Sequence, residues 1–349
     1  MKILMPFWQL ETFCRYVPQM RAISEKIDEF HIAHVMGRLD EDWRRYFEFH
    51  KVKIPHNFIS SITVRWWLSK GRMYEQIKDI DVDSYYTLSD FWSQEVVRHT
   101  ALELSKPYVV RLRGNHEIER EAKNISCYKR KFFHYFETRS LKDADLIIPI
   151  SNKLANVAAK WGVHESHISE PVPLGVDVNH FKPMDVRRSS RFTIGYAGRI
   201  SPEKGTHRLI ELARKLPNVL FLVAGRKQME ISFPTNVRYR GDLPFDEMPF
   251  FYNQCDLVIL PSLTEGFPCV ILEAYACGKP ILATSEAVPE ELRVFGAVGD
   301  VNAFPELIKE IQTWSLQSLG KETREYVEKH YTWEKFGQSI VGYLRRVVA

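Results

Sequence analysis

The sequence predicts an α/β protein with two doubly wound parallel sheets, and two observations lead to this prediction. First, 349 residues exceed the roughly 250–300 residues at which a single hydrophobic core stops growing, so two domains are expected. Second, short apolar runs alternate with segments of helical periodicity along almost the whole chain. Such alternation indicates βαβ units and parallel sheets.

The predicted strands are apolar runs that divide evenly between the two halves of the chain. They span residues 2–5, 31–35, 84–88, 108–112 and 146–150, and then 192–197, 219–224, 237–240, 257–260 and 280–283. Amphipathic helices are predicted in the gaps, among them residues 91–104, 127–141, 207–216 and 270–277. Ligands bind such sheets outside the carboxyl ends of their strands. With two sheets facing each other, the substrate site is expected in the cleft between them.

The composition excludes several classes of protein. Hydrophobic residues make up 45% and charged residues 26%, which excludes disordered, collagen-like, coiled-coil and disulfide-scaffold proteins. A net charge of +4 is too small to indicate a nucleic-acid partner. Five scattered cysteines without a C-x-x-C pair argue against a zinc site and fit a reducing compartment. The apolar start MKILMPF is too short for a signal peptide, so a cytoplasmic protein is predicted.

Two segments of the first half are unusually basic. Residues 43–72 mix aromatic with basic side chains, which suits peripheral contact with the inner face of a membrane or an extended acceptor. An ordinary helix that packs its aromatic residues into the core is the alternative. Residues 106–142 contain ten Lys and Arg against four Asp and Glu. This excess suits either an anionic partner or a solvated helix face.

The stretch FTIGYAGRISPEKG has the residues of an anion-binding turn. A predicted strand leads into Gly195 and Gly198, and a turn containing Arg199 and Lys204 precedes a helix after Gly205. Glycines let the backbone approach a ligand, and a helix N-terminus favours anions, so the two cations are candidates to bind a diphosphate. The turn matches neither a Walker P-loop nor G-x-G-x-x-G, and a purely structural turn is the alternative.

The stretch LPSLTEGFPCVILEAYACG places two carboxylates around the start of a helix. Glu265 is expected at the tip of the loop after a buried strand, and Glu273 one turn into a helix that starts near Cys269. Both carboxylates can accept hydrogen bonds from sugar or ribose hydroxyls, and the amides of the first helical turn can bind phosphate. For Glu273, an ordinary position on the helix surface is the alternative.

Together these stretches resemble the retaining, GT-B-fold glycosyltransferases of family 4. EGFPCVILE has the family's E-x7-E spacing, GYAGRISPEKG matches its phosphate-binding element, PLGVDVNHFKP is similar to its linker, and YTWEKFGQSIVGYL is similar to its C-terminal helix. The resemblance extends from about Pro107 to the C-terminus. It implies a GT-B architecture, with a Rossmann-like acceptor-side domain over residues 1–172 and 332–349. The nucleotide-sugar-binding domain would then span residues 173–331.

The resemblance also implies a role for each matching residue. Arg199 and Lys204 should neutralise the diphosphate, which is the leaving group. Glu273 should hold the ribose hydroxyls, and Glu265 should contact the sugar. Further contacts to the sugar, phosphate or nucleobase are implied for Gly198, Gly241, Leu243, Gly266, Phe267, Pro268 and Cys269.

The N-terminal half contributes one candidate, His116 in the sequence RLRGNHE. It follows a predicted strand where the family places a histidine at the domain cleft, so it should hydrogen-bond the sugar or assist the acceptor. A structural histidine is the alternative. HEIER is not H-E-x-x-H, which excludes zinc hydrolysis. The loop PFWQLETFCRY lacks the glycines that the family often has after its first strand, which puts the contacts of that loop in doubt.

No metal or other cofactor is expected. Asp81 and Asp83 form a D-x-D sequence like the metal motif of the other major glycosyltransferase fold, but the rest of that fold is missing. In GT-B members, Arg, Lys and the helix dipole stabilise the diphosphate instead.

The predicted function is transfer of a sugar, with retention, from a UDP- or GDP-linked donor to an acceptor hydroxyl of a glycan, lipid or small molecule. The predicted catalytic residues are Glu265, His116, Arg199 and Lys204. Membrane contact through residues 43–72 favours a lipid-linked acceptor. Two alternatives remain: a non-catalytic partner subunit that binds nucleotide sugars, and a phosphorylase or epimerase on the same scaffold.

Overall fold

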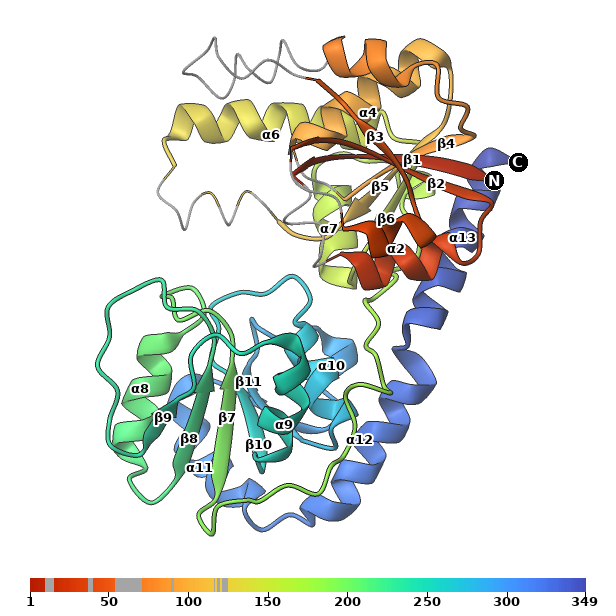
Figure 1. The fold of residues 1–349 in the computed structure, drawn as a ribbon. Coiled ribbons are helices and arrows are strands. Elements are labelled where there is room, and N and C mark those ends of the chain that lie inside the picture. The colour runs from red at the N-terminus through yellow and green to blue at the C-terminus, as the bar shows by residue number, and fades with distance from the viewer. Residues whose placement is uncertain are drawn as a thin grey trace. The chain divides into compact units, whose positions relative to one another are not determined.

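A computed structural model describes residues 1–9, 16–36, 40–53, 71–88, 91–115, 117, 120 and 125–349. The chain divides into two compact units (Figure 1). The first unit comprises Met1–Pro173 and Trp333–Ala349, and the second comprises Leu174–Thr332. The boundaries proposed from the sequence lie one residue away from these. Each unit contains a six-stranded parallel sheet, which confirms the predicted α/β class with two doubly wound sheets.

The sheet of the first unit has the strand order β3-β2-β1-β4-β5-β6. Its strands are β1 (Lys2–Gln9), β2 (Glu29–Met36), β3 (Glu48–Lys51), β4 (Ser84–Thr87), β5 (Tyr108–Leu112) and β6 (Leu146–Pro149). The residues of β4, β5 and β6 are all buried. Strands buried on both faces are typical of parallel sheets with helices on both sides.

Helices precede and follow these strands. They include α2 (Val17–Ser24), η1 (Glu41–Arg45), α4 (Phe91–Leu104), α6 (Cys127–Lys142), α7 (Asn152–Lys160), η2 (Glu165–His167) and α13 (Trp333–Val348). The C-terminal helix α13 returns to the first unit and packs on α2. Gly337 permits this approach, because a Cβ atom there would lie 2.0 Å from the carbonyl oxygen of Ala22.

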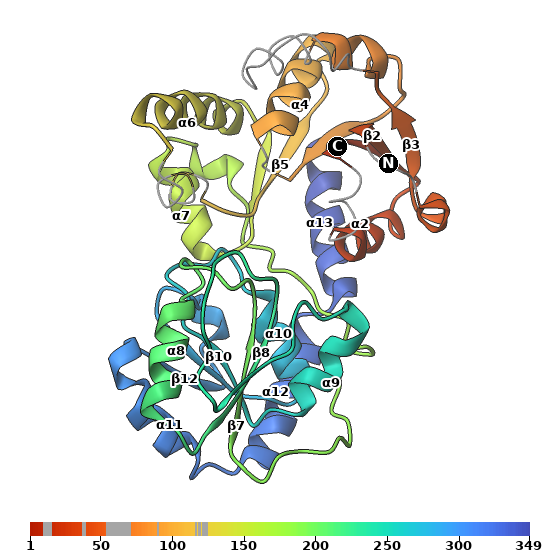
Figure 2. The same cartoon turned by 60° about the vertical axis from the view of Figure 1, so that its left-hand side comes forward.

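The sheet of the second unit has the order β12-β11-β10-β7-β8-β9 (Figure 2). Its strands are β7 (Thr193–Ala197), β8 (Leu220–Ala224), β9 (Val237–Tyr239), β10 (Leu257–Leu260), β11 (Ile281–Thr284) and β12 (Gly296–Gly299). Its helices are α8 (Thr206–Lys215), η3 (Phe245–Glu247), α9 (Met248–Asn253), α10 (Cys269–Ala276), η4 (Glu290–Leu292), η5 (Val301–Ala303), α11 (Phe304–Ile311) and α12 (Leu316–His330). One core cluster joins this sheet to α8 and α11, with Phe221 and Phe304 fully buried.

Every strand predicted from an apolar run is present, but the sequence analysis missed β3 and β12. Both are edge strands of their sheets. The sequence of β3, EFHK, is exposed at both ends, and all residues of β12, GAVG, are only half-buried. The edge position alone does not explain this, because the edge strands β6 and β9 were predicted. The sequence of β3 is mostly polar and β12 contains two glycines, so neither forms a recognisable apolar run.

Arg111 links several segments of the first unit. It lies in β5, is fully buried, and donates hydrogen bonds to the carbonyl oxygens of Ile148 at 3.3 Å, Pro149 at 3.0 Å and Val172. Its guanidinium carbon also lies 5.4 Å from the ring centroid of Phe336 in α13. Burial lowers the pKa of Arg111 to about 10, so the side chain stays charged at neutral pH. Arg111 thereby connects β6 and α13 with Val172, which lies at the end of the segment Met1–Pro173.

Arg111→Met should destabilise the protein by roughly 3 kcal/mol or more, because three buried carbonyl groups each lose a charged hydrogen-bond donor. Denaturant unfolding followed by circular dichroism would measure this loss. Arg346→Met removes an exposed guanidinium from α13 and serves as the control, with an expected change within about 0.5 kcal/mol. Equal stability of the two variants would show that the Arg111 contacts do not hold the segments together.

Candidate functional site

The candidate site lies at the carboxyl ends of β7 and β10 in the second unit. These two strands are neighbours, and the chain continues from β7 to β8 and β9 on one side and from β10 to β11 and β12 on the other. Such a topological switch point is where doubly wound sheets bind ligands. Both motifs singled out from the sequence follow these strands, the glycine turn after β7 and the Glu265 loop after β10.

Lys204 and Glu265 meet at this switch point. The Lys204 ammonium donates to both carboxylate oxygens of Glu265, each at 2.7 Å, and the hydroxyl of Ser262 donates to Oε1 at 2.8 Å. The side chains of Lys204 and Glu265 are 22% and 14% exposed. Both charged residues were predicted from the sequence, whereas Ser262 was not, although it lies within the same motif. Lys204, predicted to bind the diphosphate, and Glu265, predicted to contact the sugar, are therefore paired with each other.

Gly205 allows the glycine turn after β7 to lie directly against the loop after β10. Its φ angle is +71°, and a Cβ atom there would lie 2.0 Å from the carbonyl oxygen of Pro261. Only glycine fits a backbone contact of this kind at a positive φ angle. Helix α8 starts directly after it, so the glycine turn brings the first residues of α8 against the loop that follows β10.

Arg199 is the second cation of the glycine turn. Its Nη2 atom lies 3.4 Å from Oε1 of Glu203, and its side chain is 49% exposed. The hydroxyl of Tyr196 donates to the Arg199 carbonyl oxygen at 2.7 Å, which fixes the backbone of the turn. The Gly198 amide donates to the carbonyl oxygen of Ala224 at 2.9 Å. Arg199 can therefore bind an anion if its long ion pair with Glu203 breaks.

A pocket of about 170 Å³ separates the glycine turn from the start of α10. Lys204, Glu265, Phe267 and Cys269 are among the residues that line it. Pro268 is the N-cap residue of α10, and it has no amide proton to donate. The positive end of the α10 dipole nevertheless faces this pocket, because Cys269 and Val270 at the helix start also line it.

Gly266 and Phe267 shape the loop that leads into α10. Gly266 is half-buried, whereas Phe267 is buried and packs against Tyr331, with 6.4 Å between the ring centroids. The Phe267 ring therefore anchors the loop at the edge of the pocket.

Glu273 is held by a residue that the sequence analysis missed. The hydroxyl of Tyr252, in α9, donates to Oε2 of Glu273 at 2.5 Å. Burial raises the pKa of Glu273 above its ordinary value, and the Tyr252 hydrogen bond and the charge of His180 oppose that increase. Glu273 is half-buried, and its carboxyl group is hydrogen-bonded to Tyr252 and is not simply solvated. No spacing in the sequence linked Tyr252 to Glu273.

The loops after β8 and β9 adjoin the glycine turn. A Cβ atom on Gly225, after β8, would lie 1.9 Å from the carbonyl oxygen of Gly198, and the φ angle of Gly225 is +136°. The Gly225 amide donates to the carbonyl oxygen of Gly241 at 2.7 Å, and Leu243 nearby in sequence is half-buried. Gly225 was missed, yet it links the candidate phosphate turn to the candidate nucleobase loop.

Other candidates from the sequence lie elsewhere or outside the described residues. His116 lies outside them, as do residues 10–15 of the glycine-less first loop and residues 54–70 of the segment 43–72. Asp83 accepts a hydrogen bond from the Lys2 amide at 2.7 Å, and Asp81 accepts one from the Lys2 ammonium at 3.4 Å. Within the described part of the chain, no cluster of three or more His, Cys, Asp and Glu residues has a metal-binding arrangement.

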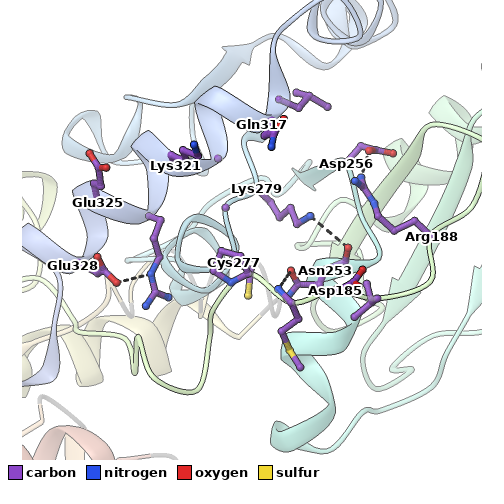
Figure 3. A pocket seen from close by; sticks show the side chains of 17 residues that line it. Asp185, Arg188, Asn253, Asp256, Cys277, Lys279, Gln317, Lys321, Glu325 and Glu328 are labelled. Carbon is purple, nitrogen blue, oxygen red and sulfur yellow. Dashed lines mark hydrogen bonds and ion pairs between the residues drawn. The ribbon is translucent and has the colours of Figure 1, made fainter.

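A larger pocket, of about 770 Å³, lies at the opposite ends of the strands (Figure 3). Asp256 and Lys279 line it just before β10 and β11 begin. Its arginines have carboxylate partners, Asp256 for Arg188 and Glu328 for Arg324. Lys279 donates to the carbonyl oxygen of Asn253 at 3.4 Å (Figure 3). Because this pocket is lined by neither the glycine turn nor the Glu265 loop, the smaller pocket at the switch point is the better candidate.

Comparison with known proteins supports the choice of the second unit. Residues 181–330 match the family Glycosyl transferases group 1. D-inositol 3-phosphate glycosyltransferase of Mycobacterium tuberculosis is 25% identical over 246 residues, which cover 61% of this chain. The match spans 51% of that enzyme, so the chain aligns with about half the length of this relative. The second unit therefore carries the sequence pattern of the glycosyl transferases group 1.

Solved structures resemble the whole chain. Sucrose-phosphate synthase from Thermosynechococcus elongatus has a TM-score of 0.77 at 16% identity, over 99% of this chain and 98% of that one. Anabaena HepE in complex with UDP-glucose has a TM-score of 0.75 at 17% identity, over 99% and 100% of the two chains. At such identities the likeness concerns the fold, and it confirms the GT-B architecture.

The unfolding free energy of the variant Glu273→Gln, relative to that of the unmodified protein, should increase as the pH rises. Burial raises the pKa of Glu273, so between its ordinary and folded-state pKa the folded chain binds more protons than the unfolded chain. The unmodified protein therefore loses unfolding free energy as the pH rises through this window, whereas the variant does not. Denaturant titrations at a series of pH values would measure the difference, which should become constant above the folded-state pKa.

Glu306→Gln is the matched control for this titration, because Glu306 is an exposed carboxylate in α11 of the same unit. Its stability difference from the unmodified protein should not follow the trend of Glu273→Gln. An identical trend in both variants would contradict the raised pKa of Glu273.

Proposed function

We propose that the protein is a retaining glycosyltransferase that moves a sugar from a UDP- or GDP-linked donor to an acceptor hydroxyl. The observation that carries this proposal is the meeting of Lys204 and Glu265 at the switch point of the second sheet. The match of residues 181–330 to the glycosyl transferases group 1 supports it. A structural neighbour in complex with UDP-glucose supports a nucleotide-sugar donor.

The donor diphosphate would bind between Arg199, Lys204 and the start of α10. Both cations are paired with carboxylates, Arg199 with Glu203 and Lys204 with Glu265. A diphosphate can replace these partners, because phosphate oxygens accept the same charge-assisted hydrogen bonds. Glu265, once released by Lys204, can accept hydrogen bonds from the sugar hydroxyls. Donor binding would thus replace the ion pair between Lys204 and Glu265 by a contact from Lys204 to the diphosphate and a contact from Glu265 to the sugar.

Glu273 would bind the ribose. Tyr252 donates to one oxygen of its carboxylate, and the other oxygen can accept from the ribose hydroxyls. The nucleobase would lie over the loops after β8 and β9, at Gly241 and Leu243. The pocket of about 170 Å³ is smaller than the roughly 300–1,000 Å³ of typical ligand sites, so it would hold only the diphosphate and sugar portion.

We propose the following transfer step for this site. The bond between the anomeric carbon and the diphosphate oxygen breaks, and the acceptor oxygen bonds to the same face of the sugar. The proton of the acceptor hydroxyl passes to the departing phosphate oxygen, so charge and atoms balance. Arg199, Lys204 and the α10 dipole would stabilise the negative charge that develops on the leaving group, and the proposal assigns no metal ion to this step.

For the acceptor, we propose a hydroxyl of a glycan or of a lipid-linked molecule, handled by a cytoplasmic enzyme at the membrane. The mixed aromatic and basic composition of residues 43–72 supports this class. None of the described helices is long and apolar enough to cross a bilayer, so such an enzyme would contact the membrane peripherally. His116 would contribute to the acceptor side.

Arg199→Ala and Lys204→Ala should each lower turnover by roughly 10²–10³-fold while the fold persists, because each removes a cation from the leaving group. Release of the nucleotide diphosphate from a UDP- or GDP-sugar would measure turnover, and circular dichroism would report the fold. Lys215→Ala, at the exposed end of α8, is the control and should keep full activity. Near-normal turnover of both pocket variants would refute these roles.

The same assay distinguishes the alternative functions. A transferase should hydrolyse its donor slowly without acceptor, with release of the nucleotide diphosphate. Tight donor binding without any turnover would instead indicate a binding subunit. Phosphorolysis by orthophosphate, or epimerisation of the sugar without an acceptor, would indicate other chemistry on this scaffold.

A further inference from the structure

Helix α6 presents one stripe of tyrosine and cationic side chains to solvent. Tyr128 is 82% exposed and Tyr135 is 60% exposed, and Lys131, Arg139 and Lys142 are exposed as well. At about 100° per residue, these five side chains lie within about 80° of the helix circumference. They follow one another along about 21 Å of the helix. We refer to these five residues as the α6 stripe.

The opposite side of α6 attaches the helix to the first unit. Its buried residues are Glu137, Ser140 and Leu141, which lie about half a turn away from the stripe. The hydroxyl of Tyr108 in β5 donates to the carbonyl oxygen of Ser140 at 2.6 Å. Glu137 is the only carboxylate in the helix, and it is paired with Arg120. The face of α6 that carries the stripe therefore contains no negative charge.

The described carboxylates that flank α6 in the sequence have other partners than the α6 stripe. Asp143, directly after the helix, is paired with Arg98 of α4 at 2.5 Å. Glu117 lies 3.7 Å from the imidazole of His134, which points to a different side of α6 than the stripe.

We propose that the α6 stripe docks the protein on a bilayer surface that contains anionic lipid. Cations near such a surface are attracted to its negative potential. Tyrosine has an apolar ring and a polar hydroxyl, a combination that suits the headgroup region of a membrane. The stripe supplies both kinds of side chain on one helix face, at a place distinct from residues 43–72. This inference does not depend on the transfer reaction.

The shape of the α6 stripe favours a bilayer over a soluble polyanion. The stripe runs along one helix and is convex, so a planar surface can contact all five side chains at once. Proteins that bind single-stranded nucleic acids instead follow the polymer with a positively charged groove. Figures 1 and 2 both draw α6 at the margin of the first unit, with α4 as its neighbour.

Co-sedimentation of the full chain with vesicles tests the proposal. The protein should sediment with phosphatidylcholine vesicles that contain phosphatidylglycerol at low salt, and remain in solution with phosphatidylcholine alone or at high salt. The double variant Lys131→Gln/Arg139→Gln should bind about 25-fold more weakly, since each cation near an anionic surface accounts for about fivefold. Tyr128→Ser/Tyr135→Ser should also reduce binding.

Matched variants in the second unit control for general effects of charge and apolarity. Lys309→Gln/Lys329→Gln removes two exposed cations from α11 and α12, and Phe250→Ser removes a ring that is 51% exposed. Both should bind vesicles like the unmodified protein, and circular dichroism should show all variants folded. Absence of binding to anionic vesicles at low salt would overturn the proposal, as would binding that the stripe variants leave unchanged. Retention by dextran sulfate without vesicle binding would assign the stripe to a soluble polyanion instead.

Discussion

The ion pair between Lys204 and Glu265 is the contact on which the candidate donor site depends. It joins two loops that leave neighbouring strands, although the residues are 61 positions apart in the sequence. Exposed ion pairs stabilise proteins by about 0–1 kcal/mol, and partial burial adds a desolvation cost, so stability is a weak reason for this pair. Substrate recognition is a stronger reason, because a diphosphate can take the place of Glu265 and the sugar hydroxyls can take the place of Lys204.

Backbone geometry holds this pair in place. Gly205 lets the glycine turn contact the loop after β10, and Gly225 lets the loop after β8 contact the glycine turn, each at a distance that a side chain would block. Tyr252 then positions Glu273 at the other side of α10. The loops after β7, β8 and β10 are therefore held against one another, and Lys204 and Glu265 meet where the loops after β7 and β10 come together.

Much of this arrangement is predictable from the sequence, because buried parallel strands have continuous apolar runs. The edge strands β3 and β12 lack such runs and were missed. At the site, Lys204 and Glu265 were found because each lies in a local motif that follows a buried strand. Tyr252 and Gly225 were missed because their partners, Glu273 and Gly198, are distant in sequence and no local spacing records the contact. Arg111 lies in the predicted strand 108–112, but its contacts with Val172 and Phe336 depend on tertiary packing that no local pattern in the sequence records.

Thermal shifts with UDP, GDP, ADP and their sugar conjugates would test the donor site most directly, on the unmodified protein and on Lys204→Ala. A ligand at 100 times its dissociation constant should add about 2.7 kcal/mol to the unfolding free energy, which gives an easily measured shift. We predict a clear preference for UDP or GDP conjugates and a much smaller shift for the variant at the same ligand concentration. No shift with any nucleotide, or equal shifts for both proteins, would contradict a diphosphate site at Lys204.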